Sequence, residues 1–247
     1  MSNLKETLKN KKSLIPFITC GDPDLTLTEK FALTLEEAGA DAVILGIPFS
    51  DPTAEGPVVY EANLRALSIG VTTDKIIEMA KSLSKKIKIP LIFMTYANVV
   101  YTYGIERFAK ESSEAGISGL VLFDIPYEER EEFAPICESF GIDFIPFVSP
   151  SKKTRIAEIS ESATGLMFIM GSGEKEVISG ILDIIRENSD VPCVAGFDDL
   201  TPNGAKEVID CSDGIALCTD IVKIIEKYGK KAQKHIFKYV KSMKDAI

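Results

Sequence analysis

Eight short apolar runs, each followed by a stretch with helical periodicity, recur along the 247 residues of the chain. Most of these runs are continuously apolar rather than alternating, which is typical of parallel strands covered on both faces. They are LIPFIT (14–19), DAVILG (41–46), PLIFMT (90–95), GLVLFD (119–124), DFIPFV (143–148), GLMFIM (165–170), PCVAG (192–196) and GIALC (214–218). Eight strand–helix units predict the α/β class: a single (β/α)8 TIM barrel domain over residues 1–247, with an extra N-terminal helix. A doubly wound open sheet is the alternative.

The acidic composition limits the classes of partner. A formal net charge of −9 argues against nucleic acid or an anionic membrane, because both would repel the chain. No uninterrupted apolar run is long enough to span a bilayer, and the polar first residues lack the apolar centre of a signal peptide. We therefore expect a cytoplasmic protein.

Cysteine and histidine give no sign of a metal centre. The five cysteines are scattered without a C-x-x-C pair, so we expect buried, reduced thiols rather than disulfides or a zinc site. The single histidine, His235, lies in a basic amphipathic stretch near the C-terminus. A histidine-based triad or metal site is therefore not expected.

The predicted strand ends tell us where a site would lie. In such barrels the functional residues come from the C-terminal ends of the strands and from the loops that follow. Asp51 and Glu55 follow the second run, and Asp124 ends the fourth. Asp51 and Asp124 would serve equally well as caps of a turn or loop, so their position alone does not decide between the two roles.

Several of these segments also resemble a known family. The stretches PFITCGDPDL, AGADAVILGIPFSDPTAEGPVVYEANLRAL, FMTYANVVYTYGIERF, DIPYEE and SDGIALCTDIVKIIEKYG are similar to the tryptophan synthase alpha subunit, in order and over nearly the whole chain. The resemblance implies a barrel lyase of tryptophan biosynthesis that splits indole-3-glycerol phosphate into indole and glyceraldehyde 3-phosphate. It implies no cofactor in this subunit, and a pyridoxal-phosphate beta subunit as the partner that takes the indole.

The resemblance assigns the chemistry to two carboxylates, and here only one is kept. Glu55 takes the place of the family's loop Asp, which interacts with the indole N–H. The family's strand-end Glu, which handles protonation of the indole carbon, falls at Ile44. A hydrocarbon transfers no proton, and general acid–base catalysis typically contributes on the order of 10²–10⁴-fold in rate. The family reaction is therefore predicted to be weak or altered.

The phosphate-binding end departs from the family pattern as well. The family's G-F-G becomes Gly196-Phe197-Asp198, followed by Asp199, and its G-S becomes Cys218-Thr219. The glycine-rich loop after the sixth strand shortens to GSGEKEV (171–177). Glycines let a backbone approach an anion, whereas carboxylates repel it.

The resemblance also implies an apolar pocket for the indole ring. The expected substrate-binding residues are Phe17, Met94, Tyr96, Leu122, Asp124, Phe168, Gly196, Phe197, Gly214 and Thr219. The alternative is that the aromatic residues among them simply pack the barrel.

Three functional hypotheses remain open from the sequence. The first is an alpha-subunit-type lyase with weak or altered activity. The second is an inactive paralogue that binds or activates a beta subunit through residues 47–55, with Asp51 and Pro52 in the contact. The third is a lyase for a different ligand without phosphate, suggested by Asp198 and Asp199.

Overall fold

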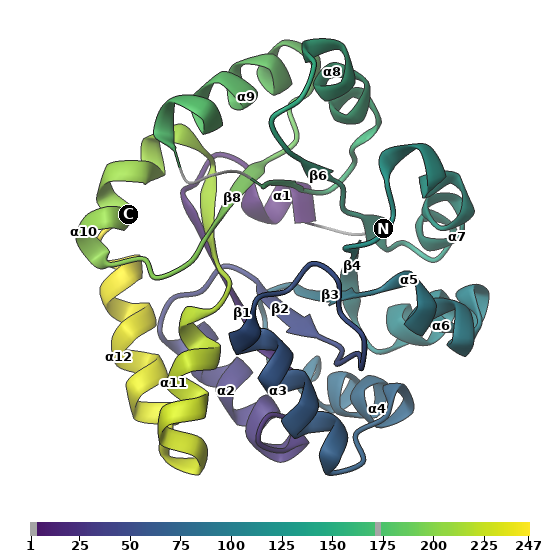
Figure 1. Ribbon diagram of the computed structural model, residues 1–247, viewed down its shortest axis with the longest axis vertical. Coiled ribbons are helices and arrows are strands. Elements are labelled where there is room, and N and C mark those ends of the chain that lie inside the picture. The colour runs from purple at the N-terminus through teal and green to yellow at the C-terminus, as the bar shows by residue number, and fades with distance from the viewer. Residues whose placement is uncertain (1–3, 171–173) are drawn as a thin grey trace.

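The computed structural model describes residues 4–170 and 174–247, and its strands lie where the sequence predicts them. In this part of the chain, nine parallel strands form one sheet in the order β5-β4-β3-β2-β1-β9-β8-β7-β6 (Figure 1). They are β1 (Ser13–Thr19), β2 (Val43–Gly46), β3 (Leu91–Thr95), β4 (Ile117–Leu122), β5 (Asp143–Phe144), β6 (Phe147–Val148), β7 (Met167–Ile169), β8 (Cys193–Phe197) and β9 (Gly214–Leu217). Each of the eight predicted runs falls on a strand, and the fifth run is split in two.

The split fifth strand closes the sheet into a barrel. Its first half, β5, pairs with β4, and its second half, β6, pairs with β7. Between the halves, the Ile145 N–H donates to the carbonyl of Leu120 (2.8 Å), and the Pro146 carbonyl accepts from the N–H of Phe168 (3.1 Å). Pro146 has no N–H of its own to add to the ladder. The ring of eight strand positions confirms the (β/α)8 class, and a doubly wound sheet would instead leave two free edges.

Helices cover the outside of the ring (Figure 1). They are α2 (Leu25–Glu37), α3 (Pro57–Ser68), α4 (Thr73–Leu83), α5 (Ala97–Tyr103), α6 (Ile105–Glu114), α7 (Ala134–Ser139), α8 (Lys153–Ser162), α9 (Lys175–Asn188), α10 (Pro202–Val208), α11 (Asp220–Tyr228) and α12 (Gln233–Lys244), with the 3₁₀ turns η1 (Tyr127–Glu132), η2 (Ile209–Cys211) and η3 (Gly229–Lys231). Several begin at side-chain caps, as when Asp24 accepts from the N–H of Leu27 at the start of α2.

Alternate strand residues build two separate cores, because successive side chains of a strand point to opposite faces. Residues such as Val43 and Leu45 pack outward against the helices. The inward residues, among them Ile15, Phe17 and Ile44, form the core inside the barrel.

The predicted N-terminal helix closes the amino end of the barrel. This helix, α1 (Leu4–Leu8), places the side chains of Leu4 and Leu8 in the inner core, where both are fully buried. Leu4 lies so close to the start of β4 that a Cβ built on Gly119 would come within 2.9 Å of the Leu4 side chain. In Figure 1, α1 lies behind the centre of the ring, which leaves the carboxyl end of the strands as the open end.

A search of the described helices finds none with the length and apolar character needed to cross a membrane.

Candidate functional site

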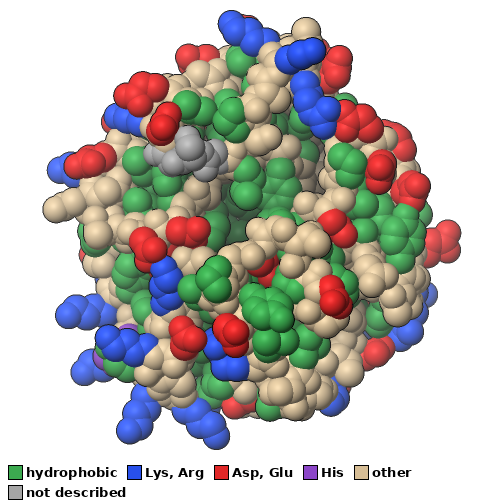
Figure 2. All heavy atoms as spheres, in the orientation of Figure 1, with side chains coloured by type: hydrophobic (Ala, Val, Ile, Leu, Met, Phe, Trp, Pro, Cys, Tyr) green, Lys and Arg blue, Asp and Glu red, His purple; other side chains and the backbone are tan. Residues whose placement is uncertain are grey.

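The open end of the barrel contains a cavity of about 140 Å³ at the carboxyl ends of the strands. Figure 2 shows this end as a hollow walled mainly by hydrophobic side chains. Its lining combines three phenylalanines of the far wall with strand-end and loop residues: Phe17, Ile44, Ala54, Glu55, Gly56, Val59, Met94, Phe123, Phe147, Phe168, Met170, Gly196, Asp198, Ala216, Cys218 and Thr219. A closed apolar cavity of roughly 150 Å³ is large enough to bind benzene, so this one suits a small flat ring.

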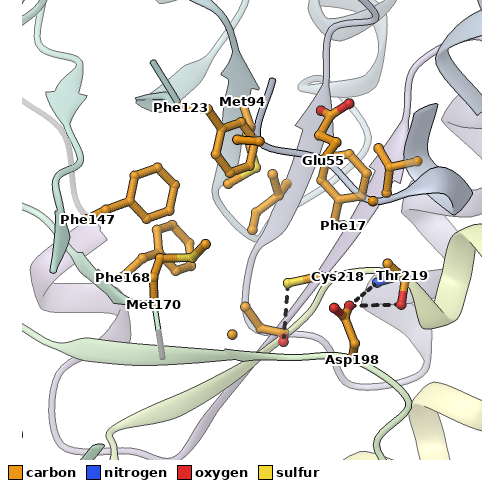
Figure 3. Close-up of a pocket in the computed structure, with 16 residues that line it drawn as sticks. Phe17, Glu55, Met94, Phe123, Phe147, Phe168, Met170, Asp198, Cys218 and Thr219 are labelled. Carbon is orange, nitrogen blue, oxygen red and sulfur yellow. Dashed lines mark hydrogen bonds between the residues drawn. The ribbon is translucent and has the colours of Figure 1, made fainter. Parts of the chain in front are cut away.

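Three neighbouring aromatic rings, one pair stacked and one pair tilted, form one wall of the cavity. Phe123 and Phe147 lie with their ring centroids 5.2 Å apart and their planes at 15°, and Phe168 follows at 5.9 Å from Phe147. In Figure 3, Phe147 and Phe168 lie on the side of the cavity opposite Phe17 and Glu55, and Phe123 lies between the two sides, next to Met94. Aromatic pairs prefer such offset geometries, and a flat aromatic ligand can extend the same stack.

Ile44 lies in the inner core and borders the cavity. The strand register pairs it with Phe17 on β1 and with Ile92 on β3, and only 2% of its surface is exposed. The ring of Phe17 fits there because Gly46 has no side chain; a Cβ on Gly46 would come within 2.5 Å of that ring. The position expected for the family's strand-end acid is therefore inside the cavity wall, and its side chain is a hydrocarbon.

Glu55 is held at the rim by a residue of the following helix. The buried Asn63 of α3 donates to Oε2 of Glu55 at 2.6 Å. Burial raises the pKa of Glu55 to about 7, although the hydrogen bond from Asn63 works in the opposite direction. In Figure 3 its carboxylate lies beside Phe17 at the edge of the cavity. A carboxyl group with this pKa exchanges a proton readily near neutral pH.

Tyr96 does not line the cavity. It contacts the loop between β2 and α3, which also carries Glu55. It is 2% exposed, and its hydroxyl oxygen accepts from the N–H of Ala54 at 3.1 Å. Its ring lies 5.8 Å from that of Phe123. Burial raises the pKa of the Tyr96 hydroxyl, so it remains protonated in this position.

Asp198 and Thr219 meet at the ends of β8 and β9. Oδ1 of Asp198 accepts from both the N–H (3.2 Å) and the hydroxyl (2.8 Å) of Thr219, which precedes the first residue of α11 (Figure 3). The next residue, Asp199, has φ of 53° and forms an ion pair with Lys223 of α11. The end of the cavity where the resemblance expects a phosphate is therefore lined by the carboxylate of Asp198, and Asp199 follows it outside the cavity lining.

Of the expected site residues, the cavity brings together Phe17, Ile44, Glu55, Met94, Phe168, Gly196 and Thr219. Leu122 and Phe197 are different, because both pack in the outer core against the helices. Their neighbours on the inner face, Phe123 and Asp198, line the cavity instead. Period-two alternation along β4 and β8 is the sequence signal that separates these pairs.

Asp124 and Gly214 also lie outside the cavity. Oδ1 of Asp124 accepts from the N–H of Ala97 at 2.8 Å and so caps the first turn of α5. Gly214 begins β9 beside Ser13, at the amino end of the barrel, and a Cβ there would come within 2.5 Å of the Ser13 carbonyl oxygen. Close packing, not ligand contact, explains this glycine.

The remaining candidates are loop and thiol groups. Asp51 is exposed and Pro52 is half-buried in the loop between β2 and α3. Residues 171–173 of the shortened loop lie outside the described residues.

Burial raises the pKa of the Cys218 thiol to about 12, so this pocket residue is not a thiolate nucleophile. Among the described residues, no group of three or more His, Cys, Asp or Glu side chains is arranged to hold a metal ion.

Known proteins match the chain over its whole length. The family model described as tryptophan synthase alpha chain matches residues 1–247. The tryptophan synthase alpha chain of Lacticaseibacillus casei is 38% identical over 255 residues, covering 100% of this chain and 96% of that protein. Tryptophan synthase subunit alpha from Legionella pneumophila has a TM-score of 0.93 at 32% identity, covering 100% of this chain and 98% of that one. A chain of the tryptophan synthase a2b2 complex from Pyrococcus furiosus has a TM-score of 0.86 at 29% identity, covering 94% and 97%.

Proposed function

Since the chain belongs to the tryptophan synthase alpha chain family, we propose that its pocket holds an indole ring and that it cleaves indole-3-glycerol phosphate only slowly. The size of the cavity and the wall of Phe123, Phe147 and Phe168 support the first part. The flat ring of the ligand would lie against this wall, where apolar burial and ring stacking both stabilise it.

The observation that carries the second part is Ile44. Its side chain borders the cavity where the resemblance expects the general acid. Losing a general acid or base typically costs about 10²–10⁴-fold in rate, which corresponds to roughly 3–5 kcal/mol of activation free energy. Among the described residues, the titratable groups that line the cavity belong to Glu55, Asp198 and Cys218, and none of them stands at the position of Ile44.

Of the two carboxylates that the resemblance implies for the chemistry, Glu55 is the one that remains. Its raised pKa and its place beside Phe17 support a role toward the edge of the bound ring, where the resemblance expects contact with the indole N–H. Glu55, in the loop after β2, does not replace a proton donor at position 44 on the strand itself. Proton transfer requires hydrogen-bond reach of about 3 Å to the reacting atom.

The test is a steady-state assay of indole release from indole-3-glycerol phosphate by the purified chain. We expect turnover on the order of 10²-fold or more below that of an alpha chain that has Glu at the position of Ile44. Glu55→Gln should lower the residual rate further. A rate equal to that of the glutamate-containing enzyme would overturn the proposal.

The second candidate function is contact with a beta subunit through the loop between β2 and α3. The likeness to a chain of the a2b2 complex supports it, as does the exposure of Asp51 in this loop. Tyr60 and Leu64, one turn apart on α3, add exposed apolar surface nearby. We expect the chain to raise the rate at which a beta subunit consumes added indole, and Asp51→Ala to reduce this effect. A beta subunit whose activity does not change would count against this candidate.

A further inference from the structure

The cavity ends at a helix N-terminus that would ordinarily attract an anion. The first N–H groups of a helix point outward and carry partial positive charge, and barrels of this class often bind phosphate there, after their last two strands. In this chain α11 begins at that place, with Thr219 as its capping residue and part of the cavity lining.

The carboxylate of Asp198 already occupies this position. A single oxygen, Oδ1, accepts both the backbone N–H and the hydroxyl of Thr219. Two donors that a phosphate would use are thus satisfied by the protein itself. Asp198 and Thr219 both line the cavity, so a ligand that bonds to these two donors of Thr219 would have to displace the Asp198 side chain.

The neighbouring charges make displacement by an anion less favourable. Asp199 follows directly, and Asp220, at the first position of α11, is 9% exposed. Burial and the charge of Asp199 raise the pKa of Asp220. Lys223 faces all three carboxylates and is paired with Asp199. An incoming phosphate dianion would therefore be repelled by a group of carboxylates of the same sign. The free-energy cost of this repulsion decreases as the salt concentration rises.

We propose that Asp198 is a specificity-determining residue that closes the anion-binding end of the cavity, so that the pocket takes an indole ring without a phosphate group. This inference rests on the proposed binding of an indole ring. It names the ligand class as uncharged: indole itself, or an indole carrying a neutral hydroxylated side chain.

The experiment compares indole, indole-3-glycerol and indole-3-glycerol phosphate by isothermal titration calorimetry with the full chain. We expect the phosphate ester to bind no more tightly than indole-3-glycerol. In Asp198→Gly, the affinity for the phosphate ester should rise by roughly tenfold or more, equal to about 1.4 kcal/mol, and this gain should exceed any change in the affinity for indole. Asp198→Asn, which removes the charge but keeps the shape, should show part of this gain.

Asp199→Asn is the matched control. It removes a neighbouring charge that has no hydrogen bond to Thr219 and does not line the cavity, so its effect on the phosphate ester should be much smaller. Thermal unfolding of each variant shows whether it is folded.

The outcomes separate this inference from the proposed function. If the wild-type chain binds the phosphate ester more tightly than indole-3-glycerol, or if neither substitution at Asp198 strengthens phosphate-ester binding, the inference is overturned while indole binding still stands. If the chain binds no indole at all, the proposed function itself fails.

Discussion

At the scale of single residues, the environment of Ile44 decides what a substitution there can do. Phe17 and Ile92 are its strand partners, and the side chain is almost completely buried. A carboxylic acid placed among these hydrocarbons would have a raised pKa, because burial disfavours the charged form. Such an acid stays protonated near neutral pH and can donate its proton to a ligand in the cavity.

The substitution Ile44→Glu should therefore raise the rate of indole release from indole-3-glycerol phosphate, by on the order of 10²-fold. Ile44→Gln is the control, because it has nearly the same shape and polarity but no titratable proton, and it should stay at the wild-type rate. The measurement is steady-state turnover on variants that circular dichroism shows to be folded. An unchanged rate in a folded Ile44→Glu chain would contradict the role assigned to this position.

Glu55 leads to a prediction about stability and pH. Its folded-state pKa of about 7 lies above the ordinary value of 4.5, so its contribution to stability is present below pH 4.5 and is lost as the pH rises through 7. Glu55→Gln stays neutral throughout. The variant should thus be more stable than wild type at pH 8, by on the order of 2 kcal/mol, and nearly equal to it at pH 4.5.

Urea denaturation at the two pH values measures this difference. Glu78→Gln, on the exposed face of α4, provides the same substitution at a site where the side chain is not buried. A Glu55→Gln variant that is less stable than wild type at pH 8 would mean that the carboxylate is stabilised in its ionised form.

At the scale of elements, the position of α3 matters because this helix carries Asn63, the partner of Glu55. An ion pair ties α3 to the loop after β1: Nε and Nη2 of Arg65 donate to the two carboxylate oxygens of Asp22, at 2.9 and 2.8 Å. The Asp22 side chain is 2% exposed and that of Arg65 is 33% exposed. Two parallel hydrogen bonds fix orientation as well as distance.

Arg65→Met should destabilise the protein by about 2–3 kcal/mol, because it leaves the buried carboxylate of Asp22 without its partner. Breaking a fully buried pair costs roughly 3–5 kcal/mol, and the partial exposure of Arg65 reduces this figure. The control is Arg155→Met, which removes an exposed pair with Glu128 and should leave stability nearly unchanged. Chemical denaturation measures the stability loss of each variant. Equal losses would show that the Arg65–Asp22 pair stabilises the protein no more than the exposed Arg155–Glu128 pair does.

At the scale of the whole molecule, two features close the barrel: a seam, where the fifth strand joins the two halves of the sheet, and a base, where α1 fills the amino end. The seam lies at Ile145 and Pro146, where the fifth strand passes from β4 to β7. The base is filled by α1, whose Leu8 is fully buried in the inner core. Because the floor of the cavity and the base belong to one continuous inner core, a defect at the base reaches the cavity through packing.

Leu8→Ala should lower the free energy of unfolding by about 2–5 kcal/mol, the usual range for a buried leucine, because the closed ring leaves little room to collapse around the new void. Leu64→Ala on α3 is the matched control: its side chain is 37% exposed, so the loss should be well under that range. Denaturant titration compares the two variants. Similar losses would indicate that α1 is not packed as described.

Much of this architecture could be predicted from local patterns. Continuous apolar runs identified every strand, including the fifth, whose interruption follows from Pro146 lacking an N–H. The sequence predicts the pocket less completely, because the list of expected binding residues does not take strand alternation into account. Leu122 and Phe197 were expected in the cavity, whereas their inward neighbours Phe123 and Asp198 line it.

The sequence by itself determined the eight strand–helix units, the family and the hydrocarbon at position 44, because periodicity, motif order and side-chain chemistry are local properties of the chain. Only the tertiary structure decided that burial raises the pKa of Glu55 against the opposing hydrogen bond from Asn63, and that Asp198 is bound to Thr219 across 21 residues of sequence. These features depend on desolvation and on distances across the ring, which arise only once the strands have closed into a barrel.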